Sequence, residues 1–364
     1  MNSIWIVLET LLISVVISVF LIPKILLISY KKRLFDMPDA RKVHQAPVPR
    51  LGGLSFMPVV VTSLCGACAT WFMWGSVDFI ALQPQIIETL FFLVGMMMLY
   101  FVGLADDLVG VGYRYKFVAQ ILAACMLLIP GLWINNFDGI LWIYEIPDWF
   151  GMLATIFFVV YVINAINLID GIDGLASGMS CIALAILGIA YLALGYYLHA
   201  ILTFGTLGVT FVFWFYNVFR IRGRKFFMGD CGSLTLGFTI SFLVLHFWRE
   251  TPHFNPFEYK LNMVALGTIA IPLLDVVRVF YARIRAHKNP FLPDKNHIHH
   301  KLMRTGMRVR WVLVTLLLLS GLVVVTNYWL AFYLNSLLIL LVDLLIWYLF
   351  HKILNYFIRR RAAK

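Results

Sequence analysis

Long uninterrupted apolar runs are the feature that most constrains this chain. Eleven such runs can be counted, each roughly 17 to 22 residues long, which is about the length at which a helix crosses the hydrocarbon of a bilayer. They lie near residues 4–22, 51–73, 89–104, 117–134, 149–166, 179–196, 199–217, 233–248, 261–277, 311–327 and 329–350. Helices satisfy their own backbone hydrogen bonds within lipid. The sequence therefore predicts an all-α integral membrane protein with about eleven transmembrane helices.

The composition supports the same class. Of the 364 residues, 62% are hydrophobic and only 13% are charged, whereas a soluble domain carries about 25% charged residues. The first run is not a typical secretory signal, because "MNSIWIVLET" has no positively charged start and no small-residue cleavage site follows. With no repeat, linker or low-complexity segment, we expect a single membrane domain over residues 1–364.

Lysine and arginine predict the orientation, since they concentrate in cytoplasmic loops. Of the 29 basic residues, 27 lie in five segments that alternate with the runs: 23–50, 105–116, 218–230, 278–310 and 351–364. The other side keeps only Arg249 and Lys260. We therefore expect the N-terminus outside and the C-terminus in the cytoplasm, as an odd number of spans requires.

The net charge of +11 raises the possibility of nucleic-acid binding. Its restriction to one set of loops is explained more simply by topology and by anionic lipid headgroups, so no nucleic-acid partner is expected. The five cysteines do not indicate a disulfide framework, and Cys65 and Cys68 form a C-x-x-C inside an apolar run, where packing between helices is the favoured interpretation.

Each expected cytoplasmic loop from the second onward carries polar residues that solubility does not explain. Asp106 and Asp107 are adjacent at the end of a run, where a solvated pair is one interpretation and a Mg²⁺ site is the other. Asp230 lies in "GDCGS" before an apolar run. This segment predicts a turn leading into a helix N-terminus, either as a simple cap or with free N–H groups that bind an anion.

The stretch "NAINLIDGIDGLASG" follows one of the most apolar runs. Asn164, Asn167 and Asp170 are spaced by three residues and share one helical face, and Asp173 follows after a glycine. Helix packing is one interpretation, but polar groups at the end of a span usually face a cavity or a partner. Amides there can bind sugar or base edges, and carboxylates can bind metal or a nucleobase N–H.

The fifth loop contains "HIHH" among several basic residues. Zinc is disfavoured because His297 and His299 alternate and no cysteine is near. Imidazoles in a basic segment suit hydrogen bonding to phosphate, with a solvated basic loop as the alternative. Taken together, the carboxylate-bearing loops predict a site for a divalent cation and phosphates at the cytosolic boundary.

The motifs resemble the bacterial polyprenyl-phosphate N-acetylhexosamine-1-phosphate transferases, and most closely the undecaprenyl-phosphate GlcNAc-1-phosphate transferase branch. The matching segments are "DMPDARKVHQAPVPRLGG", "GLADD", "KFVAQ", "NAINLIDGIDGLASG", "MGDCGSLTLGF", "IPLLDVVRVF" and "HIHH". They spread from Asp36 to His300 in the order of the family, and the count of eleven runs also resembles this branch.

The resemblance implies a reaction at the inner leaflet of the bacterial cytoplasmic membrane. A polyprenyl monophosphate attacks the β-phosphorus of a UDP-N-acetylhexosamine and gives a polyprenyl-diphospho-sugar and UMP. The implied cofactor is Mg²⁺, with Mn²⁺ as an alternative, and the partners are the UDP-sugar, undecaprenyl phosphate and the bilayer. A homodimer is left open.

The resemblance also implies a role for each matching residue. Asp230 and Asp107 would bind the metal, and Asp106 would deprotonate or orient the lipid phosphate. The catalytic set is then Asp106, Asp107 and Asp170. The substrate-binding set is Lys116, Gln120, Asn164, Asn167, Asp173, Arg278, His297, His299 and His300, with Lys116 and Gln120 on the lipid phosphate and Asp173 on the uracil.

Several alternatives remain open at the level of sequence. Direct attack by the lipid phosphate is favoured over a covalent aspartyl intermediate, because it brings fewer like charges together. GlcNAc is the expected sugar, with another UDP-N-acetylhexosamine as the alternative. The glycan made could be O-antigen, enterobacterial common antigen, teichoic acid or capsule. A transporter of an anionic substrate is disfavoured, because the carboxylates collect at one face rather than at the midplane.

Overall fold

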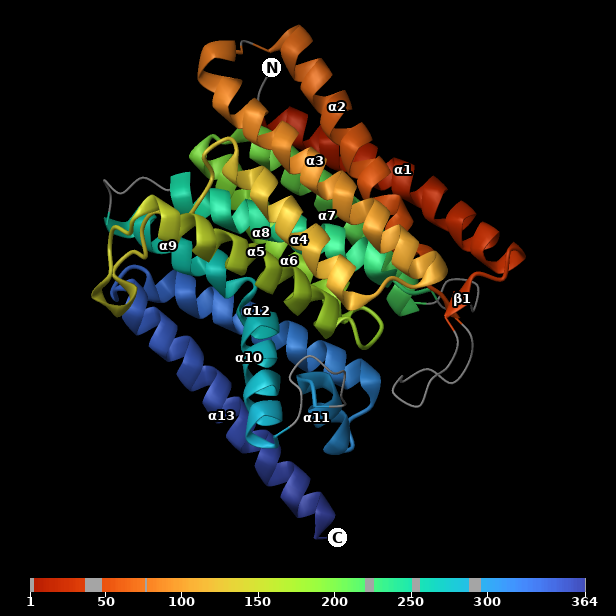
Figure 1. The fold of residues 1–364 in the computed structure, drawn as a ribbon, viewed down its shortest axis with the longest axis vertical. Coiled ribbons are helices and arrows are strands. Elements are labelled where there is room, and N and C mark those ends of the chain that lie inside the picture. Colours follow the sequence, from red (N-terminus) through yellow and green to blue (C-terminus); the bar gives the residue numbers. More distant parts are fainter. Residues whose placement is uncertain are drawn as a thin grey trace.

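The computed structural model describes residues 3–36, 48–75, 77–219, 226–250, 256–287 and 296–363, and these are almost entirely helical (Figure 1). The helices are α1 (Ser3–Lys31), α2 (Phe56–Trp74), α3 (Phe79–Val109), α4 (Tyr113–Leu128), α5 (Asp148–Ile169), α6 (Leu175–Leu194), α7 (Tyr197–Phe219), α8 (Gly229–Glu250), α9 (Pro256–Gly267), α10 (Ala270–Arg285), α11 (Ile298–Arg304), α12 (Val309–Leu330) and α13 (Ser336–Ala362). Two short 3₁₀ helices are η1 (Leu51–Ser55) and η2 (Ile140–Trp142). The expected all-α class is confirmed for these residues.

One short antiparallel strand pair accompanies the helices. β1 (Phe35–Asp36) pairs with β2 (Val48–Pro49), with Phe35 opposite Pro49. The segment between them, residues 37–47, lies outside the described residues, and it makes up the greater part of the motif "DMPDARKVHQAPVPRLGG".

The structure does not confirm the expected count of eleven spans. Within the described ranges, nine helices are long and apolar enough to cross a membrane. The other two runs differ for separate reasons: α4 has only 16 residues, and the run near 261–277 is broken into α9 and α10, which are bent by 61°. The short run near 89–104 belongs to α3, which is 31 residues long.

The bundle is organised around α8. The 18-residue apolar stretch of α8 is completely buried inside the protein. In α1 and α13, only 28% and 22% of the corresponding stretch is buried. Figure 1 shows α8 among the neighbouring helices and α13 along the edge, with α10 and α11 extending from the bundle near the C-terminal half of α13. The apolar side chains that α1 and α13 leave exposed are those expected to face lipid.

Small residues bring α8 close to its neighbours, which is the usual packing of membrane helices. A Cβ atom on Gly103 of α3 would lie 2.5 Å from the Cα of Cys231, and one on Gly237 would lie 2.8 Å from the Cα of Ile163 in α5. The contact at Gly103 brings the end of α3 against the start of α8. All five cysteines are free, which confirms that they form no disulfide framework.

Candidate active site

Four helix ends that are distant in sequence meet in one place. They are the C-terminal ends of α3 and α5 and the N-terminal ends of α4 and α8. Each contributes polar side chains that the sequence singled out, and three carboxylates lie at the centre: Asp106, Asp107 and Asp230. One oxygen from each lies within 4.8 Å of the others.

Asp107 holds the start of α8 in place. Its Oδ1 accepts the backbone N–H of Asp230 at 2.9 Å, and its Oδ2 accepts that of Cys231 at 3.0 Å. A carboxylate at a helix N-terminus is stabilised by the exposed N–H groups and by the helix dipole. The predicted turn and helix start are confirmed, but these two N–H groups are not free for an external anion, because Asp107 of α3 already occupies them.

Lys116 lies between the other two carboxylates. Its Nζ is 2.6 Å from Asp230 Oδ2 and 3.3 Å from Asp106 Oδ2. Asp106 Oδ1 accepts the backbone N–H of Val111 at 2.7 Å, in the turn between α3 and α4. The ammonium group thus neutralises part of the negative charge that the helices bring together.

The asparagines of α5 complete this side of the cluster. Asn167 donates to Asp230 Oδ1 at 3.0 Å and to Ser233 Oγ at 2.8 Å. Asn164, one turn earlier, donates to Gln120 Oε1 at 2.6 Å, and Gln120 is 2% exposed. Their common face, expected from the spacing, is confirmed, and it is directed at α4 and α8 rather than at lipid.

The residues present fit a divalent cation. Mg²⁺ binds oxygen ligands at about 2.1 Å, so opposite ligands lie about 4.2 Å apart. One oxygen of each carboxylate lies within 4.8 Å of the others, which is compatible with a shared ion, and Asp106 and Asp230 already share a cation, the Lys116 ammonium. Oxygen donors without sulfur or imidazole favour Mg²⁺ over softer metals.

The segment preceding η1 adds a cation that the sequence analysis did not assign. Arg50 Nε lies 3.8 Å from Asp107 Oδ1. The segment is fixed by backbone pairing, in which Gly52 N–H donates to the Phe227 carbonyl and Gly53 N–H to the Met228 carbonyl. A Cβ on Gly53 would lie 2.0 Å from the nitrogen of Gly232. The sequence signal for this packing is the pair Gly52 and Gly53 in "PRLGG", two residues after Arg50.

Asp170 caps the end of α5 and lies near two other carboxylates. Burial raises the pKa of Asp170 to about 7, and the negative charges of Asp173 and Asp230 add to the rise. Arg50 opposes it. Asp170 thus connects the carboxylate cluster electrostatically to Asp173.

Asp173 lines a separate cavity of about 330 Å³. The other lining residues are Val218, Arg308, Val309, Arg310 and Leu313. Arg308 and Arg310 were not predicted as site residues, because they lie in the basic segment 278–310 at the start of α12 and carry no motif of their own. The cavity combines a carboxylate, an apolar wall and two guanidinium groups.

The histidine segment is anchored to α10 by Asp275. This carboxylate is 2.9 Å from His297 Nδ1, accepts the backbone N–H of Ile298 at 3.0 Å, and pairs with Arg278 at 2.8 Å. Arg278 also donates to the carbonyl of Asn296. The structure therefore places Arg278 and His297 around Asp275, a residue that the sequence analysis quoted but gave no role.

His299 lies against the loop after α5. A Cβ on Gly171 would lie 2.2 Å from His299 Nε2, so the ring contacts this glycine directly. The ring is 2% exposed, and neither nitrogen has a hydrogen-bond partner among the described residues. Burial lowers the pKa of His299 to about 3, so it is a neutral donor or acceptor. The ring of His300 lies 4.3 Å from that of His299, measured between centroids.

The predicted site residues thus fall into three connected groups. The carboxylate cluster contains Asp106, Asp107, Lys116, Asn167 and Asp230, with Asn164 and Gln120 beside it. Asp170, Gly171 and Asp173 form the loop between α5 and α6 that connects this cluster to the cavity and to His299. Arg278 and His297 surround Asp275.

Comparison with known proteins places the chain in a family. Residues 89–247 match the family described as glycosyl transferase family 4. A Salmonella typhi protein named undecaprenyl-phosphate alpha-N-acetylglucosaminyl 1-phosphate transferase is 33% identical over 330 residues, which cover 87% of this chain and 84% of the relative. The protein of the same name from Escherichia coli K12 is 32% identical over 312 residues, which cover 82% of this chain and 79% of the relative. The one from Yersinia pestis is 31% identical over 296 residues, which cover 79% of this chain and 75% of the relative.

Proposed function

Because this chain belongs to glycosyl transferase family 4, we propose that it transfers GlcNAc-1-phosphate from UDP-GlcNAc to undecaprenyl phosphate and releases UMP. The observation that carries this proposal is the meeting of four helix ends around Asp106, Asp107 and Asp230, with Lys116 between them. Both reactants are anions, so the chemistry needs cations and positioning more than it needs a nucleophile from the protein.

In the proposed reaction, an oxygen of the lipid phosphate bonds to the β-phosphorus of the donor. The bond from this phosphorus to the oxygen that bridges it to the α-phosphate breaks, and UMP leaves with that oxygen. Asp106 orients the lipid phosphate and accepts its proton where one is present. Lys116 holds the lipid phosphate, and Gln120 supports it through the hydrogen bond to Asn164. Direct attack is favoured because a covalent aspartyl intermediate would add an encounter between a carboxylate and the anionic diphosphate.

Asp230 and Asp107 are the proposed Mg²⁺ ligands, with Asp106 beside them, and Mn²⁺ is the alternative ion. Bound Mg²⁺ would neutralise the diphosphate charge and stabilise the leaving UMP. Asn167 keeps Asp230 oriented through its hydrogen bond. Asp107 adds positioning, since both of its oxygens fix the start of α8 on which Asp230 lies.

The cavity beside Asp173 suits the nucleotide. A carboxylate accepts the N–H of a uracil ring, and guanidinium groups bind phosphate oxygens with charge-assisted hydrogen bonds. Arg308 and Arg310 thus extend the proposed binding residues beyond the resemblance. Asp170 lies on the path from this cavity to the carboxylate cluster, where the diphosphate must lie.

The neutral His299 is proposed to donate a ring N–H to the diphosphate or the sugar, with His300 next to it. His297 and Arg278 support this contact by holding the start of α11 against Asp275. Asn164 and Asn167 line the same region from α5.

The proposed topology is a single domain with the N-terminus outside and the C-terminus in the cytoplasm of a bacterial inner membrane. It requires α4 and the bent pair α9 and α10 to count as crossings beside the nine long helices. Two observations support this topology. The ends of α3, α4, α5 and α8 that share the carboxylate cluster must lie on one side of the membrane. The basic loops fall on that same side.

The test is a release assay with membranes that contain this protein. UMP should appear from UDP-GlcNAc only when undecaprenyl phosphate and Mg²⁺ are both present. A panel of UDP-N-acetylhexosamines in the same assay identifies the sugar. Absence of UMP with every donor, together with solute uptake driven by an ion gradient, would replace the transferase with a transporter.

A further inference from the structure

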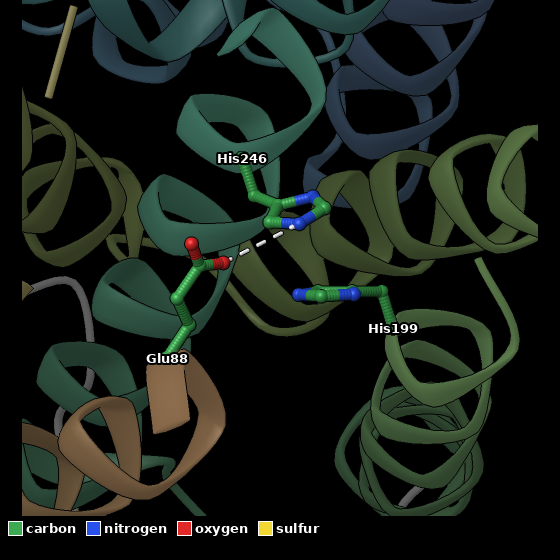
Figure 2. A group of neighbouring side chains, drawn as sticks. All are labelled: Glu88, His199 and His246. Carbon is green, nitrogen blue, oxygen red and sulfur yellow. Dashed lines mark ion pairs between the residues drawn. The ribbon is translucent and has the colours of Figure 1, made fainter. Parts of the chain in front are cut away.

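A second cluster of titratable side chains lies at the opposite end of the bundle. Glu88 of α3, His199 of α7 and His246 of α8 are 5%, 0% and 1% exposed, and each offers an atom within 4.8 Å of the others. Figure 2 shows the Glu88 carboxylate beside the His246 ring, and the His199 ring stacked against the His246 ring. The two rings are 3.5 Å apart between centroids.

This cluster is separate from the carboxylate cluster. Glu88 precedes Asp106 by 18 residues on α3, and His246 follows Asp230 by 16 residues on α8. At about 1.5 Å per residue, the two sites are about 24 to 27 Å apart along these helices. The same two helices therefore contribute to a site at each of their ends.

The hydrogen bonds around His246 leave two acceptor atoms facing each other. Tyr191 donates its O–H to the Leu243 carbonyl at 2.6 Å, so its oxygen is available to accept the N–H of His246 Nδ1 at 3.2 Å. A neutral His246 then directs the lone pair of Nε2 at Glu88 Oε2, which is 3.5 Å away. Two lone pairs at this distance in a buried place need either a proton or a metal ion between them.

His199 distinguishes a metal ion from a proton. Neither of its ring nitrogens has a hydrogen-bond partner among the described residues, and Glu88 Oε2 has none either. A proton joins only two atoms, whereas a metal ion joins all three. Zn²⁺ binds nitrogen and oxygen at about 2.0 to 2.2 Å in a tetrahedron, which sets ligand atoms about 3.4 Å apart. The Glu88–His246 separation matches this spacing.

We propose that Glu88, His199 and His246 form a binding site for a divalent transition metal of the Zn²⁺ type, which clamps α3, α7 and α8 at the end opposite the carboxylate cluster. Glu88 Oε1 is held by Arg249 at 3.5 Å, which leaves Oε2 for the metal. Tyr191 is a positioning residue, because its hydroxyl sets the ring orientation and tautomer of His246, as partners of metal-bound histidines do. A metal here opposes sliding of α3 along α8.

The test measures the metal itself in the full-length protein, purified in detergent without a polyhistidine tag. After loading with Zn²⁺ and removal of weakly bound metal, bound zinc is quantified by mass spectrometry. Wild-type protein and Asp230→Asn should retain about one zinc per chain, and Glu88→Gln and His199→Gln should retain at least ~10-fold less. Zinc should also raise the Tm of the first two proteins and not of the other two.

Tyr191→Phe keeps the ring and removes only the hydroxyl. Its zinc affinity should fall by about 10- to 100-fold, which a purely packing role of Tyr191 would not produce. His351→Gln is the matched control, since it removes a histidine of α13 outside the cluster and should leave zinc binding unchanged. Co²⁺ in the wild-type protein should show the absorption of a tetrahedral site, absent in His199→Gln.

The proposal is overturned if wild-type protein retains no zinc, or if the retained zinc depends on Asp230 and persists in Glu88→Gln and Tyr191→Phe. If the protein binds no zinc, and if its Tm depends on pH in the wild type but not in Glu88→Gln, then Glu88 and His246 share a proton instead of a metal ion. Size-exclusion profiles separate loss of metal from loss of fold, and Tyr191→Phe keeps the test valid if a histidine variant fails to fold.

Discussion

The three carboxylates of the cluster have different surroundings although they are chemically alike. Both oxygens of Asp107 accept hydrogen bonds from backbone N–H groups of α8, and Asp106 accepts the backbone N–H of Val111 in the turn after α3. Asp230 pairs with Lys116 and accepts a hydrogen bond from Asn167. The Asp230 carboxylate therefore contacts one ammonium group and one amide N–H. Binding of a metal ion and a phosphate would change both contacts. Its role can be tested separately from that of Asp107, because it caps no helix.

Asp230→Asn should lower UMP release by at least ~100-fold, because it removes a negative charge from the proposed metal site and weakens stabilisation of the transferring phosphate. The Tm in detergent should change little. The matched control is Asp343→Asn, which changes a buried aspartate of α13 that accepts from Asn327 at 3.0 Å. Full activity of Asp230→Asn would remove this residue from the metal site.

Asp170 provides a prediction about pH. Its folded-state pKa of about 7 is above its ordinary value of 3.8, so the folded protein binds this proton more tightly than the unfolded chain. The charged form therefore lowers the free energy of unfolding above pH 7, and this cost fades as the pH falls towards 3.8. Asp170→Asn should raise the Tm at pH 8 more than at pH 5.5, while UMP release falls. A lower Tm at pH 8 would contradict this account of the burial.

At the scale of elements, the loop between α5 and α6 depends on close packing with α11. Gly171 has no side chain, and the His299 ring fills the space in which a Cβ would lie. Asp275 of α10 fixes the start of α11, so α10 positions His299 through α11. Three separate segments are thereby joined beside the carboxylate cluster.

Gly171→Ala should therefore lower UMP release by at least ~10-fold, since the methyl group displaces His299 by more than the packing of a protein interior accommodates. Gly321→Ala is the matched control, because a Cβ at Gly321 of α12 meets no atom within 4 Å. That change in a helix interior should raise stability slightly, by about 0.5 to 1 kcal/mol. Equal activity of the two variants would show that His299 moves freely.

At the scale of the whole molecule, α8 is the element that the other helices surround. It is buried along its length, has Asp230 in its first turn and ends near the cluster of Glu88, His199 and His246. Residues at both of its ends pair with α3. Helices at the edge, such as α1 and α13, expose apolar side chains, whereas α8 is fully enclosed by its neighbours.

The proposed orientation can be tested with single cysteines. Glu145→Cys, in the exposed loop between α4 and α5, should react with a membrane-impermeant maleimide in intact cells, with a 5- to 10-fold stronger signal than Arg361→Cys. Arg361→Cys, at the end of α13, should react only after permeabilisation. The protein without an added cysteine gives the background labelling of its own five cysteines. The reverse pattern would invert the topology.

The sequence alone was sufficient for the helical membrane class and the family, and it singled out most of the polar residues that the structure brings together. Long apolar runs leave a chain few alternatives in lipid, and paired aspartates and asparagines at the ends of those runs are costly unless they meet a partner. The broken span of α9 and α10 and the 16 residues of α4 escaped the sequence analysis, because hydropathy records apolarity and not the bend or the length of a helix.

Only the tertiary structure decided which polar groups pair. Contacts between residues more than 100 positions apart, such as Asp107 with the start of α8 and Lys116 with Asp230, depend on how α3, α4 and α8 pack at Gly103. The contacts of Arg50, Asp275 and the Glu88 cluster also depend on packing, although Arg50 and Asp275 lie in segments that the sequence singles out. A linear sequence contains the chemistry of each residue, but the distances between helices arise from packing.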